Sequence, residues 1–135
     1  MQDVFDRQKR IDGWKQSEIA RQKVLVIGAG ALGNEVVKSL AQLGVKDVTV
    51  VDYDSIEETN LNRCVYFSPA DVGQKKAVTL ARKATTSETK VTPVNARVEE
   101  LSEEAFKTDF VFSCLDNLGA RLHVNAQAYH QSTII

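Results

Sequence analysis

Three glycines with a spacing suited to phosphate binding follow a short apolar run near the start of the chain. Residues 24–27 are uninterrupted and rich in β-branched side chains, as in a strand buried on both faces. In the turn that follows, Gly28 permits the tight bend, Gly30 lets the backbone approach a phosphate, and Gly33 lets the next helix pack against the strand. The N-terminus of that helix presents unpaired N–H groups to an anion. The pattern predicts a nucleotide site.

A single carboxylate stands where the second predicted strand ends. Asp52 lies 19 residues beyond Gly33, which places it to accept hydrogen bonds from the hydroxyl groups of a ribose. A solvated aspartate at a strand end is the plainer interpretation. Because Asp52 by itself suits NAD, FAD or ATP equally, the residues around it must decide between these nucleotides.

Amide and cationic side chains follow Asp52 in a long polar segment. Arg63 can bind a triphosphate in a forked geometry, and Asn60 can donate to phosphate or ribose oxygens. Lys75 and Lys76 come just after a glycine, where a lysine that enters a helix can reach phosphate as a point charge. Taken alone, the lysine pair is better explained as a solvated helix start. The cluster as a whole favours ATP, because a dinucleotide oxidoreductase has no need of it.

A second carboxylate follows the fourth predicted strand. Asp116 falls where it can hold Mg²⁺ against the phosphates of a nucleotide. It could instead cap the helix that follows, since aspartate is a favoured N-cap. Arg121 on that helix could pair with Asp116 or with the phosphates. The sequence leaves these roles open.

Composition excludes several classes of partner. The chain has 135 residues, of which 43% are hydrophobic and 26% charged, and a formal net charge of −1. This charge gives no reason to expect nucleic acid or an anionic membrane as a partner. We find no transmembrane span and no signal-peptide layout, so the cytoplasm is the expected location. Cys64 and Cys114 form no C-x-x-C pair, so we interpret them as reduced thiols rather than zinc ligands.

Strand-like and helix-like segments alternate along the chain. Residues 1–22 read as an N-terminal arm with a short helix that Ser17 caps, and residues 23–135 as a nucleotide-binding domain that is incomplete at its C-terminus. The expected strands are 23–27, 48–51, 90–95 and 109–114, with a fifth beginning at 132–135. The expected helices are 32–43, 75–83, 99–106 and 118–129.

This alternation predicts an α/β fold of the Rossmann-like type, with a mostly parallel sheet and helices on both faces. Right-handed crossovers place the carboxyl ends of all strands at one edge of such a sheet. Gly28, Asp52 and Asp116 each follow a predicted strand, so we expect them to meet at that edge.

An ordered set of motifs covers essentially the whole chain and resembles the adenylation domain of the ubiquitin-activating enzyme superfamily, whose bacterial and archaeal members activate the sulfur carriers of thiamine and molybdopterin synthesis. The motifs are Phe5-Asp6-Arg7-Gln8, the glycine turn, Val51-Asp52-Tyr53-Asp54, Asn60-Leu61-Asn62-Arg63, Asp71-Val72-Gly73 with Lys76, and Cys114-Leu115-Asp116-Asn117 with Arg121.

The resemblance implies transfer of AMP from ATP to the C-terminal carboxylate of a ubiquitin-like or sulfur-carrier protein that ends in Gly-Gly. In that reaction Asp52 would bind the ribose, and Asn60, Arg63 and Lys76 would bind the phosphates. The spacing from Gly73 matches the family at Lys76 rather than at Lys75.

The resemblance also implies a metal ion and a dimer. Asp116 would hold Mg²⁺, and Arg7 would reach the ATP of a partner subunit, in a homodimer or a pseudo-symmetric heterodimer. Cys64 departs from the family, in which glutamine is common, and a basic neighbour could lower its pKa. We interpret Cys64 as a packed residue rather than a nucleophile.

Two alternative functions remain open. The glycine turn and Asp52 by themselves would suit an NAD- or FAD-dependent oxidoreductase. The chain could also be a non-catalytic subunit of a heterodimeric activating enzyme, although such subunits lose the ATP-binding residues that this chain keeps at Arg63, Lys76 and Asp116.

Overall fold

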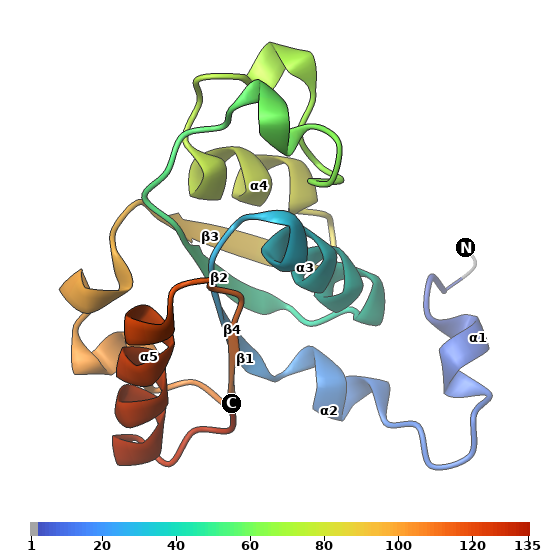
Figure 1. Ribbon diagram of the computed structural model, residues 1–135. Helices are drawn as coiled ribbons and strands as arrows, with labels where there is room; N and C mark the ends of the chain where they lie inside the picture. The colour runs from blue at the N-terminus through green and yellow to red at the C-terminus, as the bar shows by residue number, and fades with distance from the viewer. Residues whose placement is uncertain (1–2) are drawn as a thin grey trace.

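A computed structural model describes residues 3–135 of the chain. Its centre is a four-stranded sheet in the order β3-β2-β1-β4, and each neighbouring pair of strands is parallel (Figure 1). The strands are β1 (Lys23–Ile27), β2 (Asp47–Val51), β3 (Lys90–Val94) and β4 (Phe110–Ser113). Short strands of apolar, mostly β-branched residues suit a sheet that is covered on both faces.

Five α-helices and four 3₁₀ helices surround the sheet in the described residues. The α-helices are α1 (Asp6–Lys9), α2 (Gln16–Ala20), α3 (Ala31–Leu43), α4 (Lys76–Ala84) and α5 (Leu118–His130). The 3₁₀ helices are η1 (Glu58–Asn60), η2 (Pro69–Asp71), η3 (Val98–Glu100) and η4 (Glu103–Phe106).

The core consists of one apolar cluster on each face of the sheet. Alternate residues of β1 point to opposite sides, so Val26 packs with α3 and α4, whereas Leu25 packs with Phe106 and with Val124 of α5. In Figure 1, α3 and α4 lie on the opposite side of the sheet from α5. The predicted fold class, a parallel α/β sheet with helices on both faces, is confirmed.

Gly44 ends α3 and holds the N-terminal arm. Its φ of +79° is left-handed, and its N–H donates back to Ala41, as in a glycine helix stop. A Cβ at this position would stand 2.4 Å from the ring of Phe5. The glycine therefore both stops the helix and leaves room for the arm to pack against its end.

Three expected local features are wrong. The arm helix begins at Gln16, so Ser17 lies inside its first turn, and Lys15 occupies the cap position without a side-chain hydrogen bond. Residues 99–106 form two separate 3₁₀ turns, because Leu101 between them is extended at ψ 141°. Residues 132–135 contribute one parallel bridge, Phe110 to Ile134, instead of a strand.

No helix within residues 3–135 combines the length and the apolar character that a membrane span requires.

Candidate functional site

A cleft of about 430 Å³ opens at the carboxyl edge of the sheet, between the glycine turn, the segment after β2 and the segment after β4. We call it the carboxyl-edge cleft. Most of the residues predicted to form a site line it: Gly28, Gly30, Asp52, Asn60, Arg63, Lys76 and Asp116. Gly33, Lys75 and Arg7 do not. The expectation that three strand ends would meet at this edge is therefore confirmed.

The glycine turn is tight at Gly28 and Gly33 and open at Gly30. Gly28 has φ +103°, and a Cβ there would stand 2.6 Å from the carbonyl oxygen of Cys114. A Cβ at Gly33 would stand 1.8 Å from the carbonyl oxygen of Gly28, so the helix start and the turn touch. A Cβ at Gly30 would meet nothing within 4 Å. The backbone at Gly30, which caps α3, is accordingly accessible from the cleft.

Asp52 is fixed by two backbone hydrogen bonds. One carboxylate oxygen accepts from the N–H of Ala29 at 2.7 Å, and the other accepts from the N–H of Asp54 at 2.7 Å. A carboxylate has about four acceptor sites, so each oxygen can still accept from a ligand. The side chain is half-buried and fixed in direction, as a group that binds a ribose must be.

Asn60 and Arg63 lie on the loop after β2. Asn60 is buried, and its side-chain oxygen accepts from the N–H of Glu57 at 2.8 Å. This bond leaves the amide nitrogen of Asn60 to donate to a different acceptor. One terminal nitrogen of the exposed Arg63 donates to the carbonyl oxygen of Thr59 at 2.5 Å and to the side chain of Asn62 at 3.0 Å. Within residues 3–135 the other guanidinium nitrogens donate to no protein acceptor, so an anion in the cleft can take them.

The two adjacent lysines have different surroundings. The Lys76 side chain is only 13% exposed, lines the cleft, and places its Nζ 3.4 Å from the carboxylate of Asp54. The exposed Lys75 donates instead to the backbone carbonyl of Tyr53 at 3.1 Å and stays outside the cleft lining. Geometry thus distinguishes two residues that sequence spacing could confuse by one position.

Asp116 does not cap the helix that follows it. The cap is Asn117, whose side-chain oxygen accepts from the N–H of Ala120 at 3.1 Å. Arg121 donates to the carbonyl of Leu115 rather than to Asp116. No side-chain hydrogen bond or ion pair involves Asp116 in the described part of the chain, and its exposed carboxylate faces the cleft.

The residues fit a Mg²⁺ ion that arrives with a nucleotide better than a resident ion. Within residues 3–135 no three or more His, Cys, Asp or Glu side chains gather to hold a metal. Mg²⁺ typically binds through one or two carboxylates together with substrate phosphates and water. The carboxylate of Asp116, which lines the cleft and has no side-chain partner in residues 3–135, matches binding of Mg²⁺ together with substrate phosphates.

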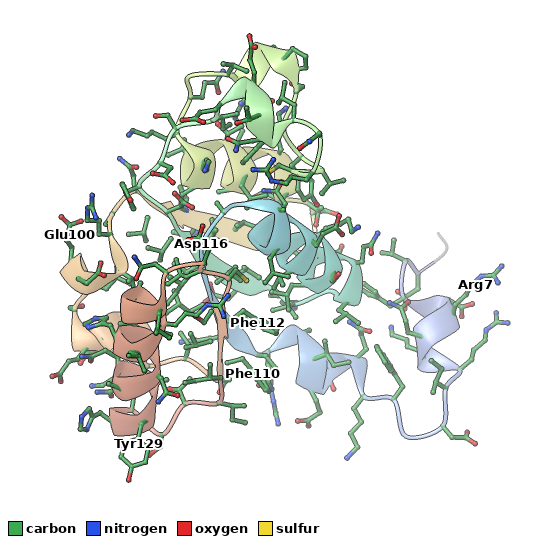
Figure 2. All side chains as sticks on the ribbon, viewed as in Figure 1. Arg7, Glu100, Phe110, Phe112, Asp116 and Tyr129 are labelled. Atoms are coloured by element: carbon green, nitrogen blue, oxygen red, sulfur yellow. The ribbon has the colours of Figure 1, made fainter. Side chains whose placement is uncertain are left out.

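Arg7 lies far from its own cleft. It is exposed on α1, and Figure 2 shows Arg7 and Asp116 on well-separated parts of the molecule. Arg7 therefore does not reach the predicted phosphates in the cleft of its own chain.

The sequence analysis missed one interaction at the cleft. The guanidinium of Arg97 stacks over the ring of Tyr53 at 4.2 Å from its centroid, and both residues line the cleft. The pair joins the segment after β3 to the segment after β2. The sequence feature that could have revealed this pair is that each residue follows a parallel strand, because all such positions lie at the same edge of the sheet.

Both cysteines are free thiols shielded from solvent, Cys64 fully and Cys114 in part. Burial raises the pKa of the Cys64 thiol and outweighs the lowering effect of its basic neighbours Arg63 and Lys76. Burial raises the pKa of Cys114 to about 11, although Arg121 acts against it. Both residues line the cleft.

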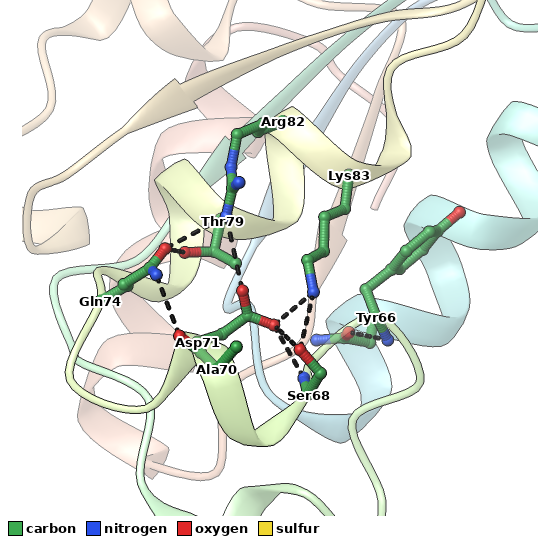
Figure 3. A network of polar contacts seen from close by, with 9 residues as sticks. Tyr66, Ser68, Ala70, Asp71, Gln74, Thr79, Arg82 and Lys83 are labelled. Atoms are coloured by element: carbon green, nitrogen blue, oxygen red, sulfur yellow. Dashed lines mark hydrogen bonds and ion pairs between the residues drawn. The ribbon is translucent and has the colours of Figure 1, made fainter.

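A polar cluster around Asp71 braces the loop that carries Asn60 and Arg63. The buried Asp71 carboxylate pairs with Lys83 of α4 and accepts from the N–H of Ser68 at 2.8 Å and from its hydroxyl at 2.6 Å (Figure 3). The hydrogen bonds from Lys83 and Ser68 hold the pKa of Asp71 well below its usual range. This cluster attaches the far end of the loop to α4, the helix that begins at Lys76.

Known proteins similar in sequence include activating enzymes for ubiquitin-like modifiers. The chain is 39% identical over 106 residues to the NEDD8-activating enzyme E1 catalytic subunit of Caenorhabditis elegans, covering 76% of this chain and 25% of that protein. It is 32% identical over 146 residues to the ubiquitin-like modifier-activating enzyme 1 of Oryctolagus cuniculus, covering 92% and 14%. The chain thus spans about a quarter or less of the length of these relatives.

Solved structures give the same result. A structure of E. coli MccB with ATP is 28% identical, with a TM-score of 0.70 over 82% of this chain and 34% of that one. TcdA (CsdL) matches 97% of this chain and 56% of its own with a TM-score of 0.85; at 22% identity it supports the fold alone. The ThiF family model matches residues 5–135. The predicted resemblance is confirmed, and the chain belongs to the ThiF family.

Proposed function

We propose that this chain is the nucleotide-binding part of an ATP-dependent adenylyltransferase that activates the C-terminal carboxylate of a ubiquitin-like or sulfur-carrier protein. One observation carries the proposal. The carboxyl-edge cleft brings the cations of Arg63 and Lys76 and the carboxylates of Asp52 and Asp116 together over a glycine turn. Two carboxylates alone would suit many nucleotides, whereas two cations beside them suit a triphosphate.

The reaction needs positioning and charge neutralisation more than covalent chemistry. A carboxylate oxygen of the modifier protein attacks the α-phosphorus of ATP, a carboxyl O–P bond forms, the bond to the bridging oxygen breaks, and pyrophosphate leaves with the electron pair. Asp52 holds the ribose, while Asn60, Arg63 and Lys76 orient and neutralise the phosphates. Mg²⁺, held by Asp116, would neutralise further phosphate charge.

The family supports this proposal over an oxidoreductase. Relatives of the chain include enzymes named for activating NEDD8 and ubiquitin-like modifiers, and a related structure contains ATP. A nicotinamide or flavin cofactor would leave Arg63 and Lys76 without a triphosphate to neutralise. A non-catalytic subunit of a heterodimeric activating enzyme is the second candidate, and the presence of Arg63, Lys76 and Asp116 favours the catalytic one.

The working unit of this proposal is a dimer. Because Arg7 lies away from its own cleft, it is free to act on the nucleotide of a second subunit, either a copy of this chain or a related one. The cytoplasm is the corresponding location for such an enzyme.

Thermal unfolding with different nucleotides tests the proposal. A ligand at one hundred times its dissociation constant stabilises a protein by about 2.7 kcal/mol, so ATP with Mg²⁺ should raise the melting temperature clearly. NAD⁺ and FAD at the same concentrations are the matched controls. Stabilisation by NAD⁺ or FAD but not by ATP would support the oxidoreductase, and stabilisation by none would support the non-catalytic subunit.

A further inference from the structure

Asn34 is a fully buried polar residue in the first turn of α3, just beyond the glycine turn. Its side chain is 0% exposed, although asparagine is rarely buried to this extent. It does not line the carboxyl-edge cleft, so a role as a direct ligand does not explain it. Its hydrogen bonds do.

The amide group of Asn34 joins two separate segments. Its nitrogen donates to the carbonyl oxygens of Ala29 at 3.0 Å and of Gly30 at 2.9 Å. Its oxygen accepts from the backbone N–H of Tyr66 at 3.1 Å. Two acceptors on one side and one donor on the other fix the orientation of the amide and satisfy both of its N–H groups.

These bonds connect the glycine turn to the loop of Arg63. Tyr66 follows Arg63 by three residues, and the N–H groups of Arg63 and Cys64 both return to the carbonyl of Asn60, so the segment is one folded unit. In the described residues the hydrogen bond of Asn34 to Tyr66 is the only one between residues 28–34 and residues 60–67. This hydrogen bond joins the loop directly to the glycine turn, whereas the Asp71 cluster holds the far end of the same loop against α4.

We propose that Asn34 is a positioning residue that sets the distance between the glycine turn and the Arg63 loop, and so spaces the cleft for a triphosphate. This inference rests on the proposed function. No other side chain of this size supplies the same bonds: aspartate lacks the two donors, and serine is too short to span both segments. Truncating Asn34 would leave the backbone N–H of Tyr66 without its acceptor. Because an unpaired buried donor is costly, the Arg63 loop should move away from the glycine turn at this point.

The test compares how Asn34→Ala and Asn34→Ser change the affinities for adenosine and for ATP with Mg²⁺, measured by calorimetry on the whole chain. Asp52 is held by the backbone N–H groups of Ala29 and Asp54 and makes no bond to Asn34 itself, so adenosine affinity should stay within about twofold. ATP affinity should fall about tenfold, the equivalent of one charge-assisted hydrogen bond. Asn34→Ser keeps a hydroxyl that can bond the carbonyl of Gly30, so it supplies the result if Asn34→Ala does not fold.

Leu40→Val provides the control. Leu40 is buried on the same helix but packs into the apolar core, so this variant weakens α3 without touching the link. It should leave the ratio of ATP to adenosine affinity unchanged. If the Asn34 variants keep the same ratio of ATP to adenosine affinity, the inference about Asn34 is wrong, but the proposed ATP site is unaffected. Absence of any preference for ATP in the unmodified chain would overturn the proposed function, and the inference with it.

Discussion

The carboxylate of Asp52 accepts a hydrogen bond from the backbone N–H of Ala29 at 2.7 Å, and this bond ties the end of β2 to the glycine turn. The neighbouring N–H of Gly28 donates to the carbonyl of Val51 at 2.8 Å, which continues the connection. A residue proposed to bind ribose thus also helps to shape the glycine turn.

Replacing Asp52 should therefore affect stability as well as binding. Asp52→Ala leaves the N–H groups of Ala29 and Asp54 without their acceptor, which should cost about 1–3 kcal/mol in chemical denaturation. Asp52→Asn keeps one acceptor oxygen and should cost less. Both variants should lose affinity for adenosine. If Asp52→Ala unfolds like the unmodified chain and binds adenosine equally well, neither role is correct.

Replacing Lys76 and replacing Lys75 should have different effects on the affinity for ATP. Lys76→Ala should weaken ATP binding about tenfold and leave adenosine binding unchanged, because only the Lys76 side chain lines the cleft. Lys75→Ala removes the same charge from the adjacent position and should change ATP affinity by less than about twofold. Calorimetry on both variants measures the difference, and equal losses would show a general charge effect instead.

Asp116 and its neighbour Asn117 allow a matched comparison for magnesium. Asp116→Asn should reduce the gain in ATP affinity that Mg²⁺ provides, and should abolish magnesium-dependent exchange of pyrophosphate in the active assembly. Asn117→Ala removes the cap of α5 and should cost about 1 kcal/mol of stability, while the effect of Mg²⁺ persists. Full dependence on Mg²⁺ in Asp116→Asn would remove this residue from the proposed metal site.

The Asp71 cluster should make stability depend on acid pH. Because the pKa of Asp71 is lower in the folded chain than in the unfolded one, its ion pair stabilises the fold above the unfolded value of about 4 and is lost as the pH falls below it. Asp71→Asn should be less stable than the unmodified chain at pH 7, and the gap should narrow below about pH 4. Urea denaturation across this range measures the gap; a gap that does not change with pH would contradict the prediction.

Arg7 should act on a second subunit. Arg7→Ala and Asp116→Ala should each be inactive in pyrophosphate exchange, and mixing them should restore part of the activity. The mixed dimer holds one cleft that has both an intact Asp116 and an Arg7 from its partner. Two preparations of Arg7→Ala mixed together form the control. Absence of rescue, with mixed dimers present, would argue against action between subunits.

The sequence was informative about everything that depends on local pattern and on the rules of parallel sheets. Gly28, Asp52 and Asp116 could be assigned to one edge, because each follows an apolar run and right-handed crossovers bring the strand ends together. The sequence was less informative about which residue caps each helix. Asp116 and Asn117 are both favoured cap residues, and only the path of the chain decides which of them the helix uses.

The sequence by itself determined the parallel α/β fold, the glycine turn and the meeting of Gly28, Asp52 and Asp116 at one edge of the sheet, since these follow from periodicity and from the order of the elements. Only the tertiary structure decided that Arg97 stacks on Tyr53 and that Asn34 connects the glycine turn to the Arg63 loop. Each of these contacts joins segments more than twenty residues apart. Such details arise when the loops close over the sheet, and no local pattern encodes them.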